Sequence, residues 1–209
     1  MEGWEIIENL HCMLTTTDHS GPLRKLNIIR QVIETRYVSG GCVEVGCNRG
    51  YTSAIIQMVL NEFSPNKSLH VYDSFSGLAG KTDKDETPLD TQTVFQEGQF
   101  AVEIEDVINT FNNYNLPHPI IHKGLMENFT SEDFPETISF AFIDLDLYEP
   151  TYQAMELLWR KMSRGGMLVV DDYHVGPLPG VTLAVDKFFR GQEVVCSPPL
   201  HTVAMIRKQ

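Results

Sequence analysis

The feature that most constrains this chain is a regular alternation of short apolar runs with segments whose apolar residues recur at helical spacing. Apolar runs of strand length occur at 42–45, 69–72, 119–122, 138–143 and 167–170. Residues 193–196 and 201–206 add two closing strands, so we expect seven strands. Strands that alternate with helices predict an α/β fold with a doubly wound, mostly parallel sheet, covered by helices on both faces.

The 209 residues suit one domain, and neither a repeat nor a second core interrupts the pattern. The expected helices lie at 4–19, 23–36, 51–63, 101–114, 151–162 and near 181–190. The second of these carries one apolar stripe, formed by Leu23, Leu26, Ile29, Ile33 and Tyr37. We assign residues 1–38 to an N-terminal helical cap and residues 39–209 to the main part of the same domain.

A polar segment from Ser76 to Gln99 stands apart, because it is rich in Lys, Asp and Thr and too poor in apolar residues to form core. Loops of this length in compact domains are usually functional lids or disordered segments. Two interpretations stay open: a lid that closes over a ligand and excludes water, and a disordered surface insertion.

The charge balance limits the partners of the chain. With 16 Lys and Arg against 28 Asp and Glu, the formal net charge is −12, which argues against a nucleic-acid partner. The acidic N-terminus lacks the basic flank of a signal peptide, and no apolar run is long enough to span a membrane. The four cysteines lack metal-ligand or C-x-x-C spacing. We expect a soluble, cytoplasmic protein that binds neither nucleic acid nor membranes.

Acidic residues gather at the carboxyl ends of the expected strands, and this distribution is the main functional signal in the sequence. They are Glu44, Asp73, Asp144, Asp146, Asp171 and Asp172. Doubly wound sheets bind ligands beyond the carboxyl ends of their strands, near the switch in strand order. We therefore expect these acids to surround a binding site.

The first strand runs into the sequence EVGCNRGYT (44–52), whose glycines allow a sharp turn and a close approach to a ligand. This sequence contains neither G-x-G-x-x-G nor the G-K-[ST] of a phosphate loop, so it favours a nucleoside without phosphates. Asp73, 27 residues after Gly46, stands where a carboxylate accepts hydrogen bonds from both hydroxyls of a ribose. The alternative is a tight turn followed by a helix-capping Asp.

The runs VEVGCNRGYTS and VYDSFSGL resemble the cofactor motifs of class I S-adenosylmethionine-dependent methyltransferases. The resemblance implies that Glu44, Gly46 and Gly50 lie near the methionine part of the cofactor and that Asp73 binds its ribose. It also implies that residues 124–126 line the adenine, namely Gly124, Leu125 and Met126. The other expected cofactor residues are Asn48, Tyr51, Thr52, Ser74, Asp144 and Asp146.

A more specific resemblance covers roughly residues 40–190. The runs HKGLMEN, FIDLDLYEPTYQAMELLW and SRGGMLVVDDYH resemble the macrocin O-methyltransferase family of sugar O-methyltransferases. This implies a Rossmann-like methyltransferase domain over residues 39–209, which transfers a methyl group from S-adenosyl-L-methionine to a hydroxyl of a sugar or glycosylated natural product. The N-terminal cap then either covers the substrate entrance or forms a homodimer contact.

Asp144, Asp171 and Asp172 are expected at neighbouring strand ends, where carboxylates repel one another unless protons or a cation neutralise them. Oxygen ligands suit Mg²⁺, and the family resemblance implies the same three residues as a magnesium site. A cation there would hold two neighbouring substrate hydroxyls, lower the pKa of the attacking one and aim it at the sulfonium methyl. Asp144 is therefore expected to be catalytic as well as a metal ligand.

Two further residues have open roles. His174, two residues beyond Asp172, is a candidate for the base that accepts the hydroxyl proton, and the alternative is a plain surface histidine. Asp146 is a metal ligand, a general base or a cofactor contact, or else a cap of the helix that begins near Thr151.

Three other functions fit parts of the pattern. A catechol or other phenol would serve as acceptor at the same metal, since any vicinal diol suits that geometry. A nicotinamide-dependent oxidoreductase uses a similar sheet, although the third glycine and a Tyr-x-x-x-Lys pair are absent. A non-catalytic nucleoside-binding module is the third, and the crowded acids argue against it.

Overall fold

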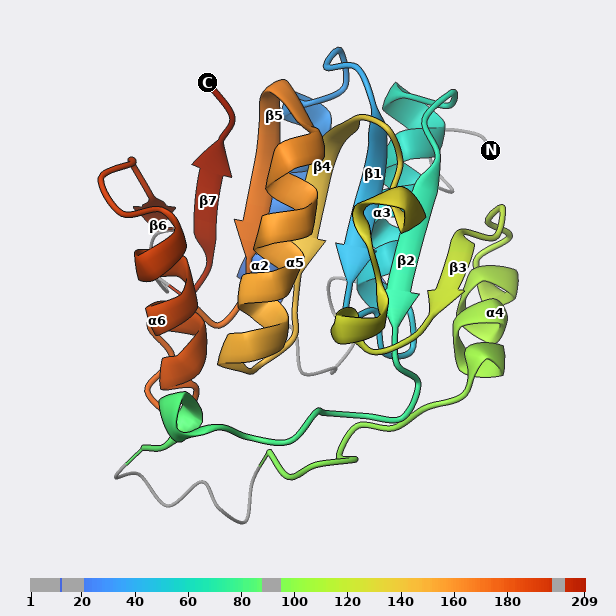
Figure 1. Cartoon of the computed structure of the whole chain (residues 1–209). Coiled ribbons are helices and arrows are strands. Elements are labelled where there is room, and N and C mark those ends of the chain that lie inside the picture. The colour runs from blue at the N-terminus through green and yellow to red at the C-terminus, as the bar shows by residue number, and fades with distance from the viewer. Residues whose placement is uncertain (1–11, 13–20, 88–94, 197–201) are drawn as a thin grey trace.

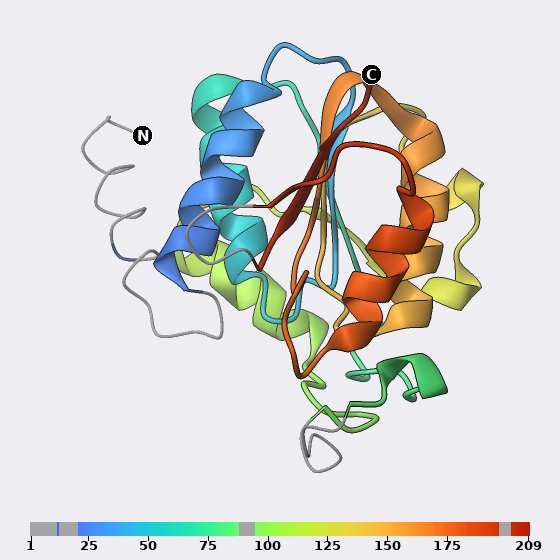
Figure 2. The same ribbon diagram turned by 90° about the vertical axis from the view of Figure 1, so that its left-hand side faces the viewer.

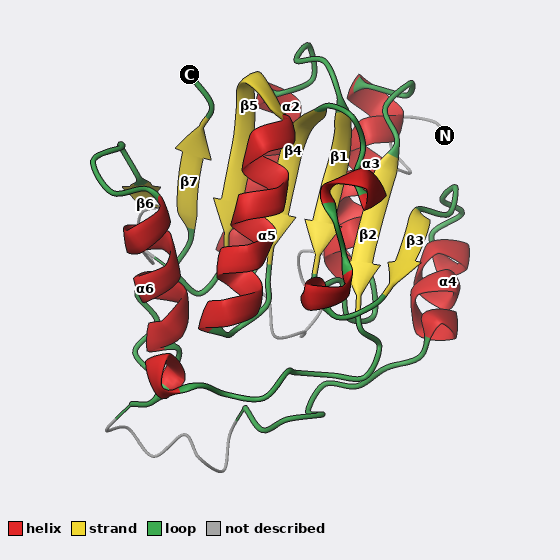
Figure 3. Cartoon of the chain, in the orientation of Figure 1, coloured by secondary structure: helices red, strands yellow, loops and turns green. Residues whose placement is uncertain are grey.

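The computed structural model describes residue 12 and residues 21–87, 95–196 and 202–209. Within them, seven strands form one sheet in the order β3-β2-β1-β4-β5-β7-β6 (Figures 1 and 3). They are β1 (Gly41–Val45), β2 (Leu69–Asp73), β3 (Ile120–Lys123), β4 (Ile138–Ile143), β5 (Met162–Val170), β6 (Val195–Cys196) and β7 (Ala204–Arg207). Strands β1 to β5 are parallel, and β7 runs antiparallel to β5 and β6. The expected doubly wound, mostly parallel sheet is confirmed.

Helices cover both faces of the sheet, as the edge-on view in Figure 2 shows. One face carries α2 (Pro22–Glu34), α3 (Tyr51–Phe63) and α4 (Ile104–Asn113), and the other carries α5 (Tyr148–Lys161) and α6 (Pro179–Phe188). Successive strand residues alternate between two apolar cores: Cys42 and Phe142 face the first group of helices, whereas Val43 and Ile143 face the second. None of the helices in the described part of the chain is both long and apolar enough to cross a membrane.

Most expected boundaries agree with the structure to within a few residues, and β5 is the exception. It begins at Met162, directly after α5, rather than at residue 167. The run 164–166 reads as a break because of its two glycines, but it remains strand, with Gly165 at a φ of +83°. The expected helix 4–19 lies outside the described residues except for Cys12, and so does residue 201 of the last expected strand.

The buried face of α2 agrees only in part with the stripe expected for residues 23–36, since Ile29 and Ile33 are partly buried and pack against the core. Leu23, Leu26 and Tyr37 are exposed. The buried side chains are those of Lys25, Ile28, Gln31 and Val32. Apolar residues stand on more than one side of this helix, and only the packing against α3 selects the buried side. As a result Arg24, one turn before Ile28, faces the carboxyl ends of the strands.

The described parts of the polar segment between β2 and α4 run across the carboxyl ends of the strands (Figure 1). Two backbone hydrogen bonds join these parts: Leu78 N–H donates to Gln99 O, and Gly98 N–H donates to Leu78 O, each at 2.9 Å. Residues 88–94 lie outside the described residues. The paired parts therefore lie over the region where the strand-end acids gather.

Asp85 anchors this segment to the beginnings of α5 and α6. It lies in a single 3-10 turn (η1, Asp83–Asp85) and is buried. Its Oδ1 accepts a 2.7 Å hydrogen bond from the N–H of Tyr148, the first residue of α5. A Cβ on Gly180 would lie 2.0 Å from the same oxygen, so α6 needs a glycine there. A distant carboxylate thus satisfies a backbone donor at the N-terminus of α5.

The turn after β1 requires a glycine at position 46. Gly46 has a φ of +85°, and a Cβ there would lie 1.8 Å from the carbonyl oxygen of Asp144. The two residues follow β1 and β4, which are neighbours at the point where the strand order reverses direction. Gly46 therefore lets the first turn pack directly against the strand end that carries Asp144.

We expect Gly46→Ala to lower the free energy of unfolding by about 2 to 5 kcal/mol, because left-handed strain of about 1 to 2 kcal/mol adds to overpacking of about 1 to 3 kcal/mol. Denaturant titration followed by circular dichroism measures the loss. Gly191→Ala is the matched control, since Gly191 has a φ of +81° but no atom within 4 Å of an added Cβ. Equal losses in the two variants would contradict a special role for the contact with Asp144.

Candidate active site

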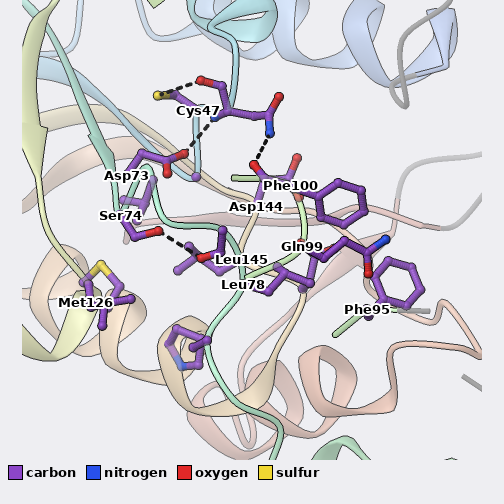
Figure 4. Close-up of a pocket in the computed structure, with 18 of the residues that line it drawn as sticks. Cys47, Asp73, Ser74, Leu78, Phe95, Gln99, Phe100, Met126, Asp144 and Leu145 are labelled. Carbon is purple, nitrogen blue, oxygen red and sulfur yellow. Dashed lines mark hydrogen bonds between the residues drawn. The ribbon is translucent and has the colours of Figure 1, made fainter. Parts of the chain in front are cut away.

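A cavity of about 1060 Å³ opens at the carboxyl ends of the strands (Figure 4). Nearly all of the expected cofactor residues line it: Glu44, Gly46, Asn48, Tyr51, Thr52, Asp73, Ser74, Gly124, Leu125, Met126, Asp144 and Asp146. The exception is Gly50, which does not line the cavity and forms the left-handed N-cap of α3. In Figure 4, Asp73, Ser74 and Met126 lie on one side of the cavity, and Phe95, Gln99 and Phe100 lie on the other.

Glu44 is a buried carboxyl group at the floor of the cavity. Its side chain is on β1, is 1% exposed, and accepts a hydrogen bond from the hydroxyl of Ser53. Burial raises the pKa of Glu44 to about 8, and the Ser53 hydrogen bond opposes that rise. The carboxyl group therefore holds a proton near neutral pH, and a cationic ligand beside it would favour the charged form.

Asp73, at the end of β2, is held in place by two backbone donors. Its Oδ2 accepts a hydrogen bond from Asn48 N–H, and its Oδ1 accepts one from Phe75 N–H, both at 2.8 Å. A carboxylate has about four lone-pair sites, so each oxygen keeps one for another donor. This geometry fits a pair of neighbouring hydroxyls such as those of a ribose.

The loop after β3 forms an apolar part of the wall. Gly124 N–H donates a 2.9 Å hydrogen bond to the carbonyl oxygen of Asp73, which ties this loop to β2. Leu125 and Met126 follow and line the cavity, and Met126 is buried. An apolar wall beside a fixed carboxylate suits a planar base attached to a ribose.

Asp144, Asp171 and Asp172 converge as expected. Ile143 of β4 pairs with Val170 of β5, so the residues that follow the two strands are neighbours. One carboxylate oxygen from each of the three residues lies within 4.8 Å of those of the other two. Mg²⁺ binds oxygens at about 2.0 to 2.1 Å, so two opposite ligands are about 4.2 Å apart. The donor set is therefore of the type that a hard divalent cation takes, and the carboxylates would move closer together to bind one.

The charges of this acid cluster, defined as Asp144, Asp171 and Asp172, also affect its neighbours. Burial and then repulsion by Asp144 raise the pKa of Asp172 to about 6. Burial raises the pKa of Asp146 well above its usual range, and Asp144 and Asp172 add to the rise. These shifts show that full ionisation of the site is costly without a compensating cation.

Arg24 supplies such a cation in this structure. Its Nη1 forms an ion pair with Asp171 Oδ2 and lies 3.5 Å from Asp144 Oδ2. Burial raises the pKa of Asp144, and the guanidinium of Arg24 opposes that rise. No sequence motif marks Arg24, because its role depends on which side of α2 is buried.

His174 does not reach the cavity. It is exposed, it has a φ of +62°, and its backbone N–H donates a 2.9 Å hydrogen bond to Thr182 Oγ1. Its ring stacks on Tyr173, with the two ring centroids 3.9 Å apart. The structure therefore does not bring together His174 and the acid cluster, and it gives no support to His174 as the base.

Several further cavity residues are not singled out individually by the sequence, although some lie in the polar segment 76–99, for which a lid and a disordered insertion are the two interpretations. They are contributed by the segment between β2 and α4 and by the turn before α6, and they include Leu78, Phe95, Gln99, Phe100, Pro177 and Leu178. Asn48 Nδ2 donates a 3.0 Å hydrogen bond to the carbonyl oxygen of Phe100, which holds the segment against the turn after β1. Only the tertiary structure brings these residues to the site.

The strand order, the glycine turn against β4 and the carboxylate at the end of β2 together define a class I methyltransferase. Comparison with known families agrees: the macrocin-O-methyltransferase (TylF) family matches residues 17–206, and the chain belongs to this family. It is thus an S-adenosylmethionine-dependent O-methyltransferase.

Two relatives and one solved structure illustrate the similarity. Demethyldecarbamoylnovobiocin O-methyltransferase of Streptomyces niveus is 27% identical over 84% of this chain and 67% of its own length. The 8-demethyl-8-(2,3-dimethoxy-alpha-L-rhamnosyl)-tetracenomycin-C 4'-O-methyltransferase of Streptomyces olivaceus is 28% identical over 73% of this chain and 61% of its own length. The solved structure of the O-methyltransferase NovP is 26% identical in sequence and superimposes with a TM-score of 0.77. The superposition includes 90% of this chain and 81% of the NovP chain.

The raised pKa of Glu44 predicts a pH-dependent stability. The stability that comes from keeping its proton is complete below the unfolded pKa of about 4.5 and is lost as the pH rises through about 8. Glu44→Gln cannot ionise, so we expect the melting temperature of the variant relative to the unsubstituted protein to rise between about pH 5 and about pH 9. Exposed Glu62→Gln is the control and should give a flat difference. A flat difference for Glu44→Gln as well would contradict the prediction.

Proposed function

We propose that this chain methylates a hydroxyl of a sugar or of a glycosylated small molecule, and that Mg²⁺ is held by Asp144, Asp171 and Asp172. One observation carries the proposal: Asp144 and Asp172 line the same cavity as the residues expected to bind S-adenosylmethionine. Two relatives whose names describe natural-product O-methyltransferases support it, and one of those names includes a rhamnosyl group.

The residues of the chain would bind the cofactor in three places. The free lone pairs of Asp73 accept the two ribose hydroxyls, and residues 124–126 cover the adenine. Gly46 lets the methionine part approach the backbone, and Glu44 provides a negative charge for its amino group. The cationic sulfonium would then lie in the cavity beside the contact between Gly46 and Asp144.

Methyl transfer is an in-line displacement. The acceptor oxygen forms a bond to the methyl carbon while the carbon–sulfur bond breaks, and the sulfonium becomes a neutral thioether. When bound, Mg²⁺ would lower the pKa of the attacking hydroxyl. A carboxylate oxygen of Asp144, which lines the cavity, accepts the hydroxyl proton. The chain therefore contributes position, charge and a proton acceptor.

The wall beyond the acid cluster favours a polyhydroxylated acceptor over a phenol. Glu149 and Gln153 line the cavity, as do the apolar Pro177 and Leu178. A carboxylate and an amide provide hydrogen-bond partners for several hydroxyls, whereas a flat phenol requires apolar walls on both faces. Lys84 forms a 2.5 Å ion pair with Glu149 and so holds that carboxylate in place.

We expect calorimetry to show binding of S-adenosylmethionine, and we expect Asp73→Ala to weaken it by at least about tenfold, because charged hydrogen bonds contribute about 1.5 to 3 kcal/mol each. Exposed Asp83→Ala is the control and should bind normally. With methyl α-L-rhamnoside as the acceptor probe, mass spectrometry should detect a methylated sugar. Absence of cofactor binding would refute the proposal, and transfer to catechol alone would favour the phenol alternative.

The metal has a separate test. We expect a chelator to abolish methyl transfer and added Mg²⁺ to restore it, and we expect Asp172→Asn to lower the rate by at least about a hundredfold while calorimetry shows an unchanged affinity for S-adenosylmethionine. Asp83→Asn, exposed and outside the cavity, is the control and should retain its rate. A full rate in chelator would show that the acid cluster works without a metal.

A further inference from the structure

The acid cluster already contains a positive group. Arg24 Nη1 pairs with Asp171 Oδ2 and lies 3.5 Å from Asp144 Oδ2. The Arg24 side chain is 14% exposed and that of Asp171 is 2% exposed, so solvent screens this pair only weakly. A guanidinium in this position compensates the negative charge of carboxylates that a divalent cation would otherwise neutralise.

The guanidinium and a metal ion would both use the carboxylates of Asp144 and Asp171. Mg²⁺ requires its oxygen ligands at about 2.0 to 2.1 Å in near-octahedral geometry, which leaves no place for an N–H donor on the metal-facing side of the same carboxylates. Two positive groups held within one partly buried cluster also repel each other strongly. A metal ion at this cluster would therefore disfavour the contact between Arg24 and Asp171.

We propose that Arg24 and the divalent cation are alternative occupants of the acid cluster, so that Arg24 is the built-in counter-ion of the metal-free protein and sets the apparent metal affinity. This inference rests on the metal part of the proposed function. Arg24 also lines the cavity, so its release changes the wall that an acceptor meets. Metal binding would then precede acceptor binding.

The role of Arg24 has opposite effects on two measurable properties. Without Arg24, the metal-free protein loses the partner of a buried carboxylate and becomes less stable. The same substitution removes the competitor and strengthens metal binding. A purely structural residue would lower stability without improving the affinity for a metal, so the two signs together distinguish the roles.

The test uses Mn²⁺ alone, with free Mn²⁺ measured by electron paramagnetic resonance. We expect Arg24→Met to bind Mn²⁺ about tenfold more tightly than the unsubstituted chain and to melt at a lower temperature without metal. Arg30→Met is the matched control, because Arg30 lies on the same helix with a side chain that is 72% exposed and paired only to surface Glu34 in the ion pairs of the described residues. It should bind Mn²⁺ like the unsubstituted chain.

A second measurement needs no variant. Phenylglyoxal modifies accessible guanidinium groups, and peptide mass spectrometry measures the modification of each arginine. We expect Mg²⁺ to increase the modification of Arg24 in the unsubstituted chain, while Arg30 is modified equally with and without metal. This measurement keeps the proposal testable if Arg24→Met folds poorly.

The outcomes separate the inference from the function on which it rests. Equal or weaker Mn²⁺ binding by Arg24→Met overturns the competition. Tighter binding without any change in the reactivity of Arg24 also overturns it, because charge repulsion alone explains that result. If neither chain binds Mn²⁺, both the inference and the metal site fail, whereas calorimetry with S-adenosylmethionine still tests methyl transfer.

Discussion

Mutual repulsion among Asp144, Asp171 and Asp172 is the constraint on which the rest of the site depends. Parallel pairing of β4 with β5 places the backbones of these three residues close together, so their carboxylates lie near one another. Their burial removes the screening that water would give. Protons, a guanidinium or a metal ion must therefore compensate the charge, and each choice leaves the site in a different chemical state.

The glycine at position 46 connects this cluster to the part of the cavity that is proposed to bind the cofactor. Because a Cβ would collide with the carbonyl oxygen of Asp144, the turn after β1 and the end of β4 touch through backbone atoms alone. Glu44 lies two residues before Gly46. Its side chain is buried, and its raised pKa keeps it protonated near neutral pH. A cationic cofactor that binds beside Glu44 would thus lower the pKa of this carboxyl group and favour loss of its proton.

The strand-end residues could be predicted from the sequence. Side chains alternate between the two faces of a strand, and the carboxyl ends of parallel strands lie at one edge of the sheet, so the topology alone places these residues. The convergence of the acid cluster and the position of Asp73 follow from that rule. Arg24 could not be predicted, since the apolar residues of α2 leave its buried side open until α3 packs against it. The position of His174 could not be predicted either. It lies two residues after Asp172, but its left-handed backbone conformation leaves its side chain exposed. Gly165 and Gly166 read as a break, whereas β5 passes through them.

The segment between β2 and α4 is fixed at two places that belong to different halves of the cavity. Asp85 attaches its first part to the beginnings of α5 and α6, and the carbonyl oxygen of Phe100 attaches its last part to Asn48 beside the cofactor turn. The backbone bonds between Leu78, Gly98 and Gln99 join the two parts. Because these bonds join the two parts, a substitution at either attachment can shift the lining that the segment gives to both ends of the cavity.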